Sequence, residues 1–218
     1  MPQVTIDQWV QHVHRGAIGS FPTDTVPALS AHPDFADQIY TIKSRSAEKP
    51  LILMAGDSQD LWPYLDSDRH DSINCQAHWQ TMMDTYFPGA LTLVLPKRHQ
   101  TLLRLNPSQT GTIGVRVPNH NLARTILRQT GPLATTSVNR SGEPALLNMA
   151  DIRSQFPKIY TLSDLALNQL GIVESAISAV TPPLPSTVIE WIGNGWMILR
   201  QGAIVFSDAE KDIYRILN

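Results

Sequence analysis

Apolar side chains recur at helical spacing in several stretches of the chain. The first such helix is marked by four residues, Ile6, Trp9, Val10 and Val13. Thr5 or Asp7 can begin this helix and Gly16 can end it. The same kind of pattern predicts further helices over residues 34–43, 59–65, 72–87, 119–130, 149–156 and 207–217. Pro33 stands at the start of the second helix, and Asn119 can cap the fifth.

Between these helices lie short apolar or alternating runs that are typical of strands. Residues 51–55 are continuously apolar, as expected of a strand buried on both faces, and residues 112–118 alternate. Further strands are predicted for residues 17–18, 90–95, 133–139, 185–192 and 196–200. The last two form a predicted hairpin across residues 193–195. Helices alternating with strands predict a single α/β domain over residues 1–218, with a mixed open sheet.

Residues 21–29, FPTDTVPAL, concentrate small hydroxyl side chains beside an acid. Pro22 and Pro27 bracket Thr23, Asp24 and Thr25, and proline fixes φ and removes a backbone donor. We therefore expect neither a helix nor a regular central strand here. Two interpretations stay open: a rigid loop that presents polar groups at the end of the sheet, or a surface turn whose side chains bond their own backbone.

Other polar side chains stand at the ends of predicted elements. Lys43 and Arg45 lie two apart at the end of a helix, where they either complement the helix dipole or form a clamp for phosphates. Arg116 shares one face of its strand with Thr112 and Gly114, either exposed over a half-covered sheet or in contact with a ligand.

Ser137 and Asn139 share a face at the end of another predicted strand, followed by the turn-forming Arg-Ser-Gly, and Ser186 and Thr187 begin a later one. The pair Ser137 and Asn139 suits either a nucleotide contact or an ordinary strand-end turn. In open α/β sheets ligands settle beyond the strand ends, so these clusters are candidates for one shared cleft.

The composition and charge of the chain indicate an ordinary globular domain and argue against several other classes of protein. The 218 residues are 42% hydrophobic and 17% charged, which is ordinary for a globular domain. The net charge of -2 argues against tight non-specific binding of nucleic acid over the whole surface. The single cysteine, Cys75, fits a reducing cytoplasm. No apolar run approaches the roughly 20 residues of a membrane span, and no signal-peptide pattern opens the chain, so we expect no membrane partner.

Common catalytic and nucleotide-binding motifs are missing from the sequence. Of the seven histidines only His12 and His14 are close, and two positions apart on a helix they cannot share a face, so no metal site is predicted. No GxSxG, GxxxxGK[ST] or GxGxxG pattern occurs. If the protein binds a nucleotide, it does so through residues that belong to none of these motifs.

Taken together, the motifs resemble a known family. In order along residues 16–204 they are PTDT, KxR, KPL, PGxLTLVL, VRVP, SxNRSG, PSTV and ILRxGAI. This series resembles the YrdC-like family, the L-threonylcarbamoyladenylate synthases, in the short form without an extra C-terminal domain. The resemblance implies a twisted open sheet with a large concave basic cleft. It also implies synthesis of threonylcarbamoyl-AMP and pyrophosphate from L-threonine, bicarbonate and ATP, and a downstream transferase that passes the threonylcarbamoyl group to tRNA.

The matching motifs imply roles for individual residues. The implied threonine contacts are Thr23, Arg116, Thr135 and Ser186. The implied nucleotide contacts are Lys43, Arg45, Thr112, Ser137, Asn139 and Arg200, with Thr135 also near the nucleotide. Lys43 and Arg45 are the implied catalytic residues, meeting the phosphates and the carbamate. Such chemistry needs positioning and cations, with Mg²⁺ carried on ATP instead of a protein-ligated metal.

The chain departs from the family pattern in three places. Pro27 and Ala28 replace the Tyr-Gly of TVYGL, Ser46 replaces the proline of KxRP, and Gln201 replaces the proline of LRPG. Two alternative functions stay open. One is a paralogue that binds a nucleotide but acts on another substrate. The other is a non-catalytic module that binds tRNA or double-stranded RNA through its basic residues, Lys43, Arg45, Lys49, Arg116, Arg140 and Arg200.

Overall fold

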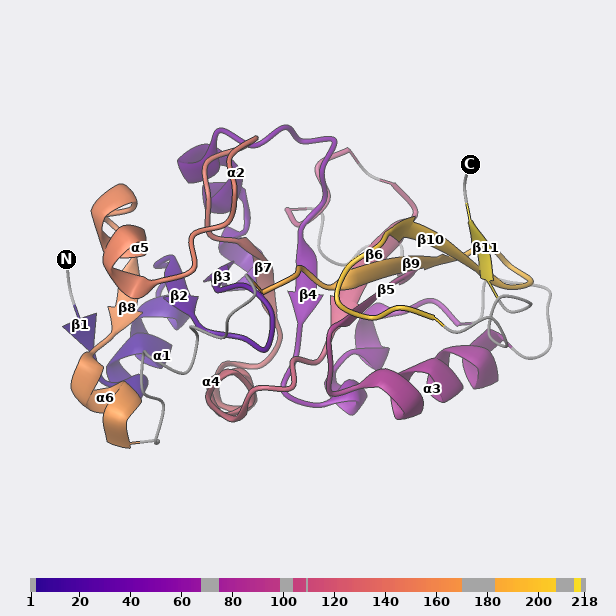
Figure 1. Cartoon of the computed structure of the whole chain (residues 1–218), viewed down its shortest axis with the longest axis horizontal. Coiled ribbons are helices and arrows are strands. Elements are labelled where there is room, and N and C mark those ends of the chain that lie inside the picture. The colour runs from indigo at the N-terminus through magenta and orange to yellow at the C-terminus, as the bar shows by residue number, and fades with distance from the viewer. Residues whose placement is uncertain are drawn as a thin grey trace.

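The computed structural model describes residues 3–67, 75–98, 104–108, 110–169, 183–206 and 214–216. Its strands form one 11-stranded sheet in the order β1-β8-β2-β3-β7-β4-β6-β5-β9-β10-β11 (Figure 1). The strands are β1 Gln3–Val4, β2 Gly19–Phe21, β3 Ala28–Ala31, β4 Ile52–Met54, β5 Leu91–Pro96, β6 Thr112–Arg116, β7 Leu133–Ser137, β8 Tyr160–Leu162, β9 Thr187–Trp191, β10 Trp196–Arg200 and β11 Tyr214–Ile216. Parallel pairs such as β4 with β6 occur beside antiparallel pairs such as β3 with β7, so the predicted mixed sheet is confirmed.

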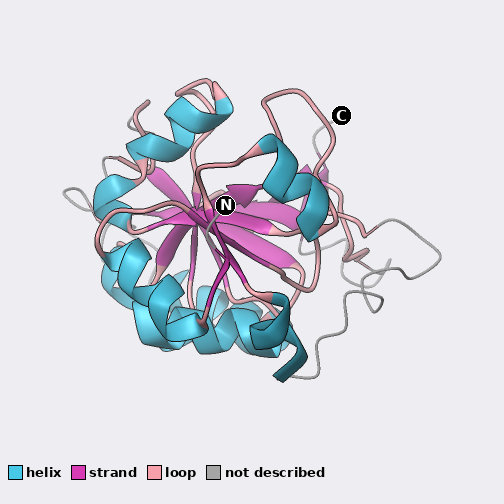
Figure 2. Cartoon of the chain, turned by 90° about the vertical axis from the view of Figure 1, so that its left-hand side faces the viewer, coloured by secondary structure: helices cyan, strands magenta, loops and turns pink. Residues whose placement is uncertain are grey.

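Helices lie on both sides of the sheet, as Figure 2 shows from the β1 end of the molecule. They are α1 Ile6–His14, α2 Asp37–Lys43, α3 Cys75–Tyr86, α4 Asn121–Thr130, α5 Met149–Gln155 and α6 Asp164–Gln169. Three 3-10 turns add to them, η1 Pro33–Phe35, η2 Ser58–Asp60 and η3 Trp62–Tyr64. Among the described residues, no helix is long and apolar enough to cross a membrane.

Strand alternation divides the sheet into a covered face and a face that carries polar groups. Leu91, Leu93 and Leu95 of β5 belong to the larger core, together with Trp79 of α3. Thr92 points to the opposite face because side chains alternate along a strand. There its hydroxyl lies 2.9 Å from that of Ser186. The polar face of β5 is therefore the face on which Ser186 lies.

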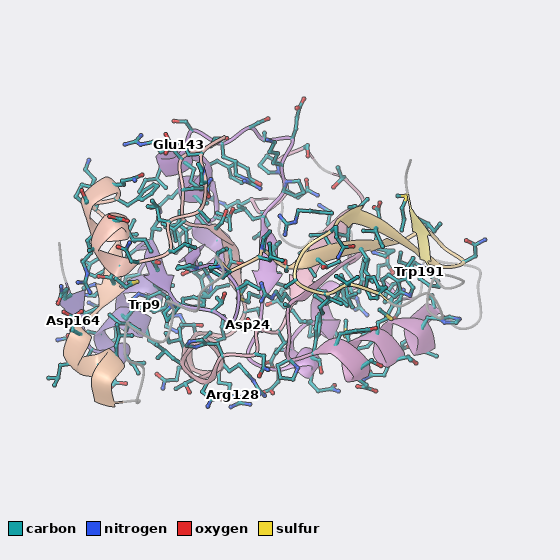
Figure 3. The ribbon with its side chains drawn as sticks, viewed as in Figure 1. Trp9, Asp24, Arg128, Glu143, Asp164 and Trp191 are labelled. Atoms are coloured by element: carbon teal, nitrogen blue, oxygen red, sulfur yellow. The ribbon has the colours of Figure 1, made fainter. Side chains whose placement is uncertain are left out.

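A second, smaller core covers part of that opposite face. Trp9 and Val13 of α1 pack there with Ile126 of α4 and with Met54 of β4. The helical spacing predicted for α1 is confirmed, and Thr5 caps it in a reciprocal pair with Gln8. Figure 3 shows Trp9 of this core and Trp191 of the larger core toward opposite ends of the molecule. This smaller core covers only part of the polar face, and Thr92 and Ser186 do not belong to it.

The proline-bracketed stretch 21–29 is part strand and part loop. Phe21 ends β2 and Ala28 begins β3, which pairs with β2 on one side and β7 on the other. The expectation that no central strand occurs here was thus wrong for residue 21 and for residues 28–29. Pro27 precedes the strand, and its carbonyl accepts the amide N–H of Val138, so its lack of a donor costs no ladder bond.

Three predicted helices are corrected by the structure. Residues 59–65 form η2 and η3, because Pro63 lacks the donor that a continuous helix needs. Residues 34–43 divide into η1 and α2. Within 207–217, residues 214–216 are the strand β11, parallel to β10; the open edge of β10 supplies ladder bonds that outweigh the weak local preference. Residues 207–213 and 72–74 lie outside the described part of the chain.

Several smaller differences concern element ends. His120 caps α4 in place of Asn119, its Nδ1 accepting the N–H of Ala123. The strand expected at residues 17–18 begins at Gly19. The hairpin of β9 and β10 is confirmed. The two-residue β1, the three-residue β8 and α6 were not predicted, because elements this short have little sequence pattern of their own.

Candidate functional site

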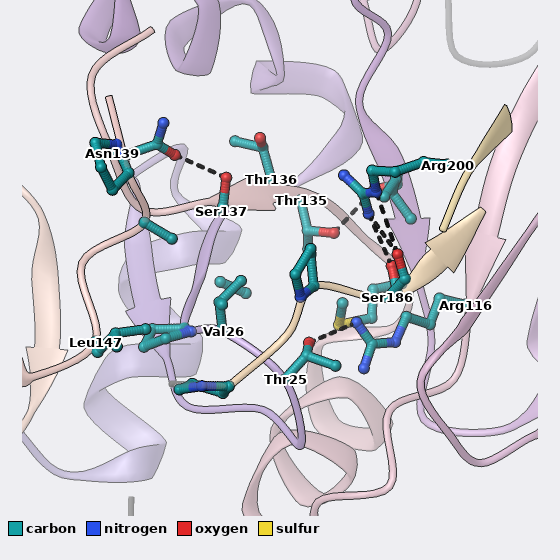
Figure 4. A pocket seen from close by; sticks show the side chains of 18 of the residues that line it. Thr25, Val26, Arg116, Thr135, Thr136, Ser137, Asn139, Leu147, Ser186 and Arg200 are labelled. Atoms are coloured by element: carbon teal, nitrogen blue, oxygen red, sulfur yellow. Dashed lines mark hydrogen bonds between the residues drawn. The ribbon is translucent and has the colours of Figure 1, made fainter. Parts of the chain in front are cut away.

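A cavity of about 500 Å³ opens on the polar face of the sheet (Figure 4). Its walls come from the loop before β3, from β4, β6 and β7, from the segment 143–147, and from residues 183–186 with β10. Seven of the residues predicted from the motifs line it, Arg45, Arg116, Thr135, Ser137, Asn139, Ser186 and Arg200. The fold therefore brings together polar side chains that are up to 155 positions apart (Arg45 to Arg200).

Arg116 sits at the carboxyl end of β6 and is only 4% exposed. Its Nε donates to the carbonyl of Gly89 (3.0 Å), and its Nη1 donates to the hydroxyl of Thr25 (2.8 Å). Its Nη2 lies 2.7 Å from a carboxylate oxygen of Asp24. Burial lowers the pKa of Arg116, the Asp24 carboxylate raises it, and the nearby charge of Arg200 lowers it. Arg116 is thus a fixed, buried cation that faces the cavity.

Arg200 approaches the cavity from β10 and pairs with Ser186. Its Nη2 donates to the Ser186 carbonyl (2.7 Å) and to the Ser186 hydroxyl (3.2 Å). Gly202 allows this close packing, because a Cβ there would lie 2.3 Å from the Pro185 carbonyl oxygen. Arg200 is exposed overall, and partial burial of its guanidinium lowers its pKa. Arg116 and Arg200 repel each other, so an anion between them is electrostatically favoured.

The far end of the cavity is built from the end of β7. The Ser137 hydroxyl donates to Asn139 Oδ1 (2.7 Å), and Asn139 Nδ2 donates to the carbonyls of Arg140 and Glu143 (2.8 Å each). Thr135 also lines the cavity, and its hydroxyl donates to the Ile52 carbonyl (3.1 Å). Hydroxyl and amide groups are therefore held in place along one wall.

Arg45 lines the cavity next to this wall. Its guanidinium donates to the carbonyls of Lys49 (2.9 Å) and Pro50 (3.2 Å), which hold it at the end of α2. Burial lowers its pKa. These two bonds leave guanidinium N–H groups for a phosphate or carboxylate.

Lys43 lies beneath the wall and does not line the cavity. It is 1% exposed, and its ammonium donates to the Ser137 carbonyl and to Asn139 Oδ1 (2.9 Å). Burial, followed by the charge of Arg45, lowers the pKa of Lys43 to about 7. In this structure Lys43 supports two cavity residues directly, and its predicted contact with phosphate stays a prediction.

Two other predicted residues also stand away from the cavity lining. The hydroxyl of Thr23 donates to the Val26 carbonyl (2.8 Å) and accepts the Thr25 N–H (3.2 Å), so it organises the loop. Thr112 begins β6, about 13 Å along the strand from Arg116. Their predicted ligand contacts stay predictions.

The structure adds residues that sequence reasoning did not assign. Thr25 and Met54 line the cavity, as does Glu143, the only acid among its described lining residues. Asp24 and Thr25 were visible as polar groups in the loop, but their bonds join them to a residue 92 and 91 positions away. Nothing in the local pattern marks such a partner.

No metal-binding cluster of three or more His, Cys, Asp or Glu side chains occurs in the described part of the chain. The cavity lining offers three arginines and one glutamate. This donor set suits an anion or a metal that arrives already coordinated by phosphate oxygens.

Comparison with known proteins places this fold in a family. The Sua5/YciO/YrdC model, described as telomere recombination, matches residues 11–202, and the chain belongs to this family. A protein of Chromohalobacter salexigens named threonylcarbamoyl-AMP synthase is 33% identical over 162 residues, which are 72% of this chain and 83% of that protein.

Solved structures of P. abyssi Sua5 have the same fold. A double variant has a TM-score of 0.79 at 26% identity, covering 97% of this chain and 61% of that one. A complex of the same protein with L-threonine has a TM-score of 0.79 at 24% identity, covering 97% and 58%. The chain thus spans about three fifths of that protein's length.

Proposed function

We propose that this chain is an L-threonylcarbamoyladenylate synthase, which forms threonylcarbamoyl-AMP and pyrophosphate from L-threonine, bicarbonate and ATP. The observation that carries the proposal is the cavity that joins the Arg116, Ser186 and Arg200 cluster to Arg45, Ser137 and Asn139. Its volume of about 500 Å³ lies in the range typical of ligand sites. The name of the C. salexigens relative favours this enzyme over a non-catalytic RNA-binding paralogue.

The amino acid binds at the Arg116 end in this proposal. A guanidinium presents paired N–H donors that match a carboxylate. The hydroxyls of Thr25 and Ser186 stand beside it, and the Thr25 hydroxyl is bonded to Arg116. The threonine complex of P. abyssi Sua5 supports an amino-acid site in this fold.

ATP binds toward the other end, with phosphate oxygens near Arg45 and the Ser137–Asn139 wall. The threonine amine first attacks bicarbonate, giving a carbamate and water. A carbamate oxygen then attacks the α-phosphorus, and the bond to the β-phosphate breaks to release pyrophosphate. Charge grows on the phosphate oxygens in this step, and nearby arginines stabilise it. Mg²⁺ enters with the triphosphate as part of the substrate.

The side chain of the amino acid meets an aliphatic wall where the family carries Tyr-Gly. Val26, Pro27 and Ala28 line the cavity there, and Leu147 lines it as well. This wall is the place where the chain can differ from its relatives in amino-acid selectivity. Cytoplasmic location and a downstream threonylcarbamoyl transferase that modifies tRNA belong to the same proposal, whereas direct binding of tRNA or double-stranded RNA by this chain belongs to the alternative, the RNA-binding module.

The test is release of pyrophosphate from ATP by the purified protein. Release must require both L-threonine and bicarbonate, with L-serine added as a competitor to measure selectivity. Release that ignores threonine would instead favour a paralogue with another substrate. Salt-sensitive binding of tRNA without any pyrophosphate release would favour the RNA-binding module.

A further inference from the structure

Arg116 uses only part of its capacity to donate hydrogen bonds. A guanidinium has five N–H groups. In the described part of the chain three of them are engaged, by the Gly89 carbonyl, the Thr25 hydroxyl and the Asp24 carboxylate. One N–H on each of Nη1 and Nη2 remains. A carboxylate that binds through both of its oxygens needs two N–H donors on neighbouring nitrogens, and Arg116 has two left.

Asp24 is placed to fix that remaining pair. Its side chain is 15% exposed, and its Oδ1 lies 2.7 Å from Nη2 of Arg116. It does not line the cavity, whereas Arg116 and Thr25 do. The loop that carries Asp24 is itself held by Thr23, whose hydroxyl bonds both Thr25 and Val26. The loop therefore holds Asp24 against the guanidinium without placing it in the cavity lining.

Asp24 also acts on an ionisable group outside the cavity lining, His120. Burial lowers the pKa of His120, and the Asp24 carboxylate opposes that shift. His120 is engaged as the cap of α4 through its Nδ1 (3.4 Å to the Ala123 N–H). Arg116 is thus the group with which the Asp24 carboxylate makes its close ion pair.

We propose that Asp24 is a positioning residue for substrate carboxylate recognition. Its carboxylate and the Thr25 hydroxyl lock the plane of the Arg116 guanidinium, so that the two unused N–H groups face the cavity as a preformed fork. The proposal rests on the proposed function, in which Arg116 receives the carboxylate of the amino acid. Preorganisation of this kind strengthens binding because the side chain has no rotamers left to lose.

Two other roles for Asp24 predict different results. If Asp24 merely neutralises a buried charge, its removal lowers stability and leaves threonine affinity unchanged. If Asp24 instead competes with the substrate for Arg116, its removal tightens threonine binding. Only positioning predicts weaker binding that depends on the carboxylate of the ligand.

The experiment measures binding of L-threonine and of L-threoninamide, which lacks the carboxylate, by titration calorimetry. The wild type is compared with Asp24→Ala and with Asp24→Asn, which keeps the acceptor oxygen but loses the charge. Asp57→Ala is the matched control, because Asp57 also pairs with arginines, but these two, Arg124 and Arg128, do not line the cavity. Thermal unfolding and the KM for threonine in pyrophosphate release are measured for every variant.

We expect Asp24→Ala to raise the Kd and KM for threonine about tenfold, with a smaller change in kcat, since a mobile guanidinium loses its fork geometry. Asp24→Asn should restore part of this loss. The preference for threonine over threoninamide should fall by a similar factor in Asp24→Ala. If Asp24→Ala does not fold, the same loss of preference, reduced in size, is expected in Asp24→Asn.

Unchanged or tighter threonine binding in the folded Asp24 variants would overturn the positioning role while the proposed function stands. A wild-type protein that neither binds threonine nor releases pyrophosphate contradicts the proposed function itself. The two failures are therefore separated by the wild-type measurement.

Discussion

The ammonium of Lys43 lies 2.9 Å from Oδ1 of Asn139, a residue 96 positions later in the chain. The same ammonium donates to the Ser137 carbonyl, so one buried cation joins the end of α2 to the end of β7. Two motifs that are far apart in sequence are thereby one structural unit beside the cavity.

This burial predicts a dependence of stability on pH. The pKa of Lys43 is about 7 in the folded protein and 10.5 when exposed, so between these values the unfolded chain binds a proton that the folded one does not. Stability therefore rises with pH across this window and is flat below about pH 7. From pH 7 to pH 9 the unfolding free energy of the wild type should rise by about 2 kcal/mol relative to Lys43→Met.

Chemical denaturation of both proteins at the two pH values measures this difference. The comparison with Lys43→Met cancels the other titrating groups. An equal change in the two proteins would mean that Lys43 keeps an ordinary pKa in the fold.

Removal of the Arg45 guanidinium should impair catalysis far more than stability. Arg45 is half-buried and faces the cavity, where charge develops on phosphate in the proposed reaction. Arg45→Ala should lower kcat by about 100-fold, the usual effect of losing one stabilising donor. Arg104→Ala is the control, since Arg104 forms an exposed ion pair with Asp37 and does not line the cavity. Similar rates for the two variants would remove Arg45 from the reaction.

Two neighbouring hydroxyl residues, Ser186 and Thr187, have different expected roles, one in substrate binding and the other in stability. The Ser186 hydroxyl lies in the cavity between Thr92 and Arg200. The Thr187 hydroxyl bonds the backbone of Gly202 and Ile204 instead. Ser186→Ala should raise the KM for threonine about tenfold, and Thr187→Val should lower stability by ~1–3 kcal/mol with KM unchanged. Steady-state kinetics and urea unfolding measure the two effects. A higher KM in Thr187→Val with an unchanged KM in Ser186→Ala would mean that the amino acid does not bind beside Ser186.

Much of the fold could be predicted from the sequence because buried apolar residues recur at a regular spacing along each helix and strand. Trp9 and Val13 mark α1, and the alternation around Arg116 marks β6, whose two faces differ in chemistry. The short strands could not be predicted because they are stabilised by pairing with neighbouring strands and have little sequence pattern of their own. β8 exists between β1 and β2, and β11 exists beside β10.

The site was predictable in its residues more than in its geometry. Motif order identified seven residues that line the cavity. It could not show that Lys43 is buried beneath the wall or that Asp24 pairs with Arg116. These relationships depend on contacts between distant segments, which local pattern does not encode.

The central claim is tested most directly by pyrophosphate release from ATP with each substrate left out in turn. We expect release that requires both L-threonine and bicarbonate, and that falls by about 100-fold in Arg45→Ala. Pyrophosphate release at the same rate without threonine would contradict this claim.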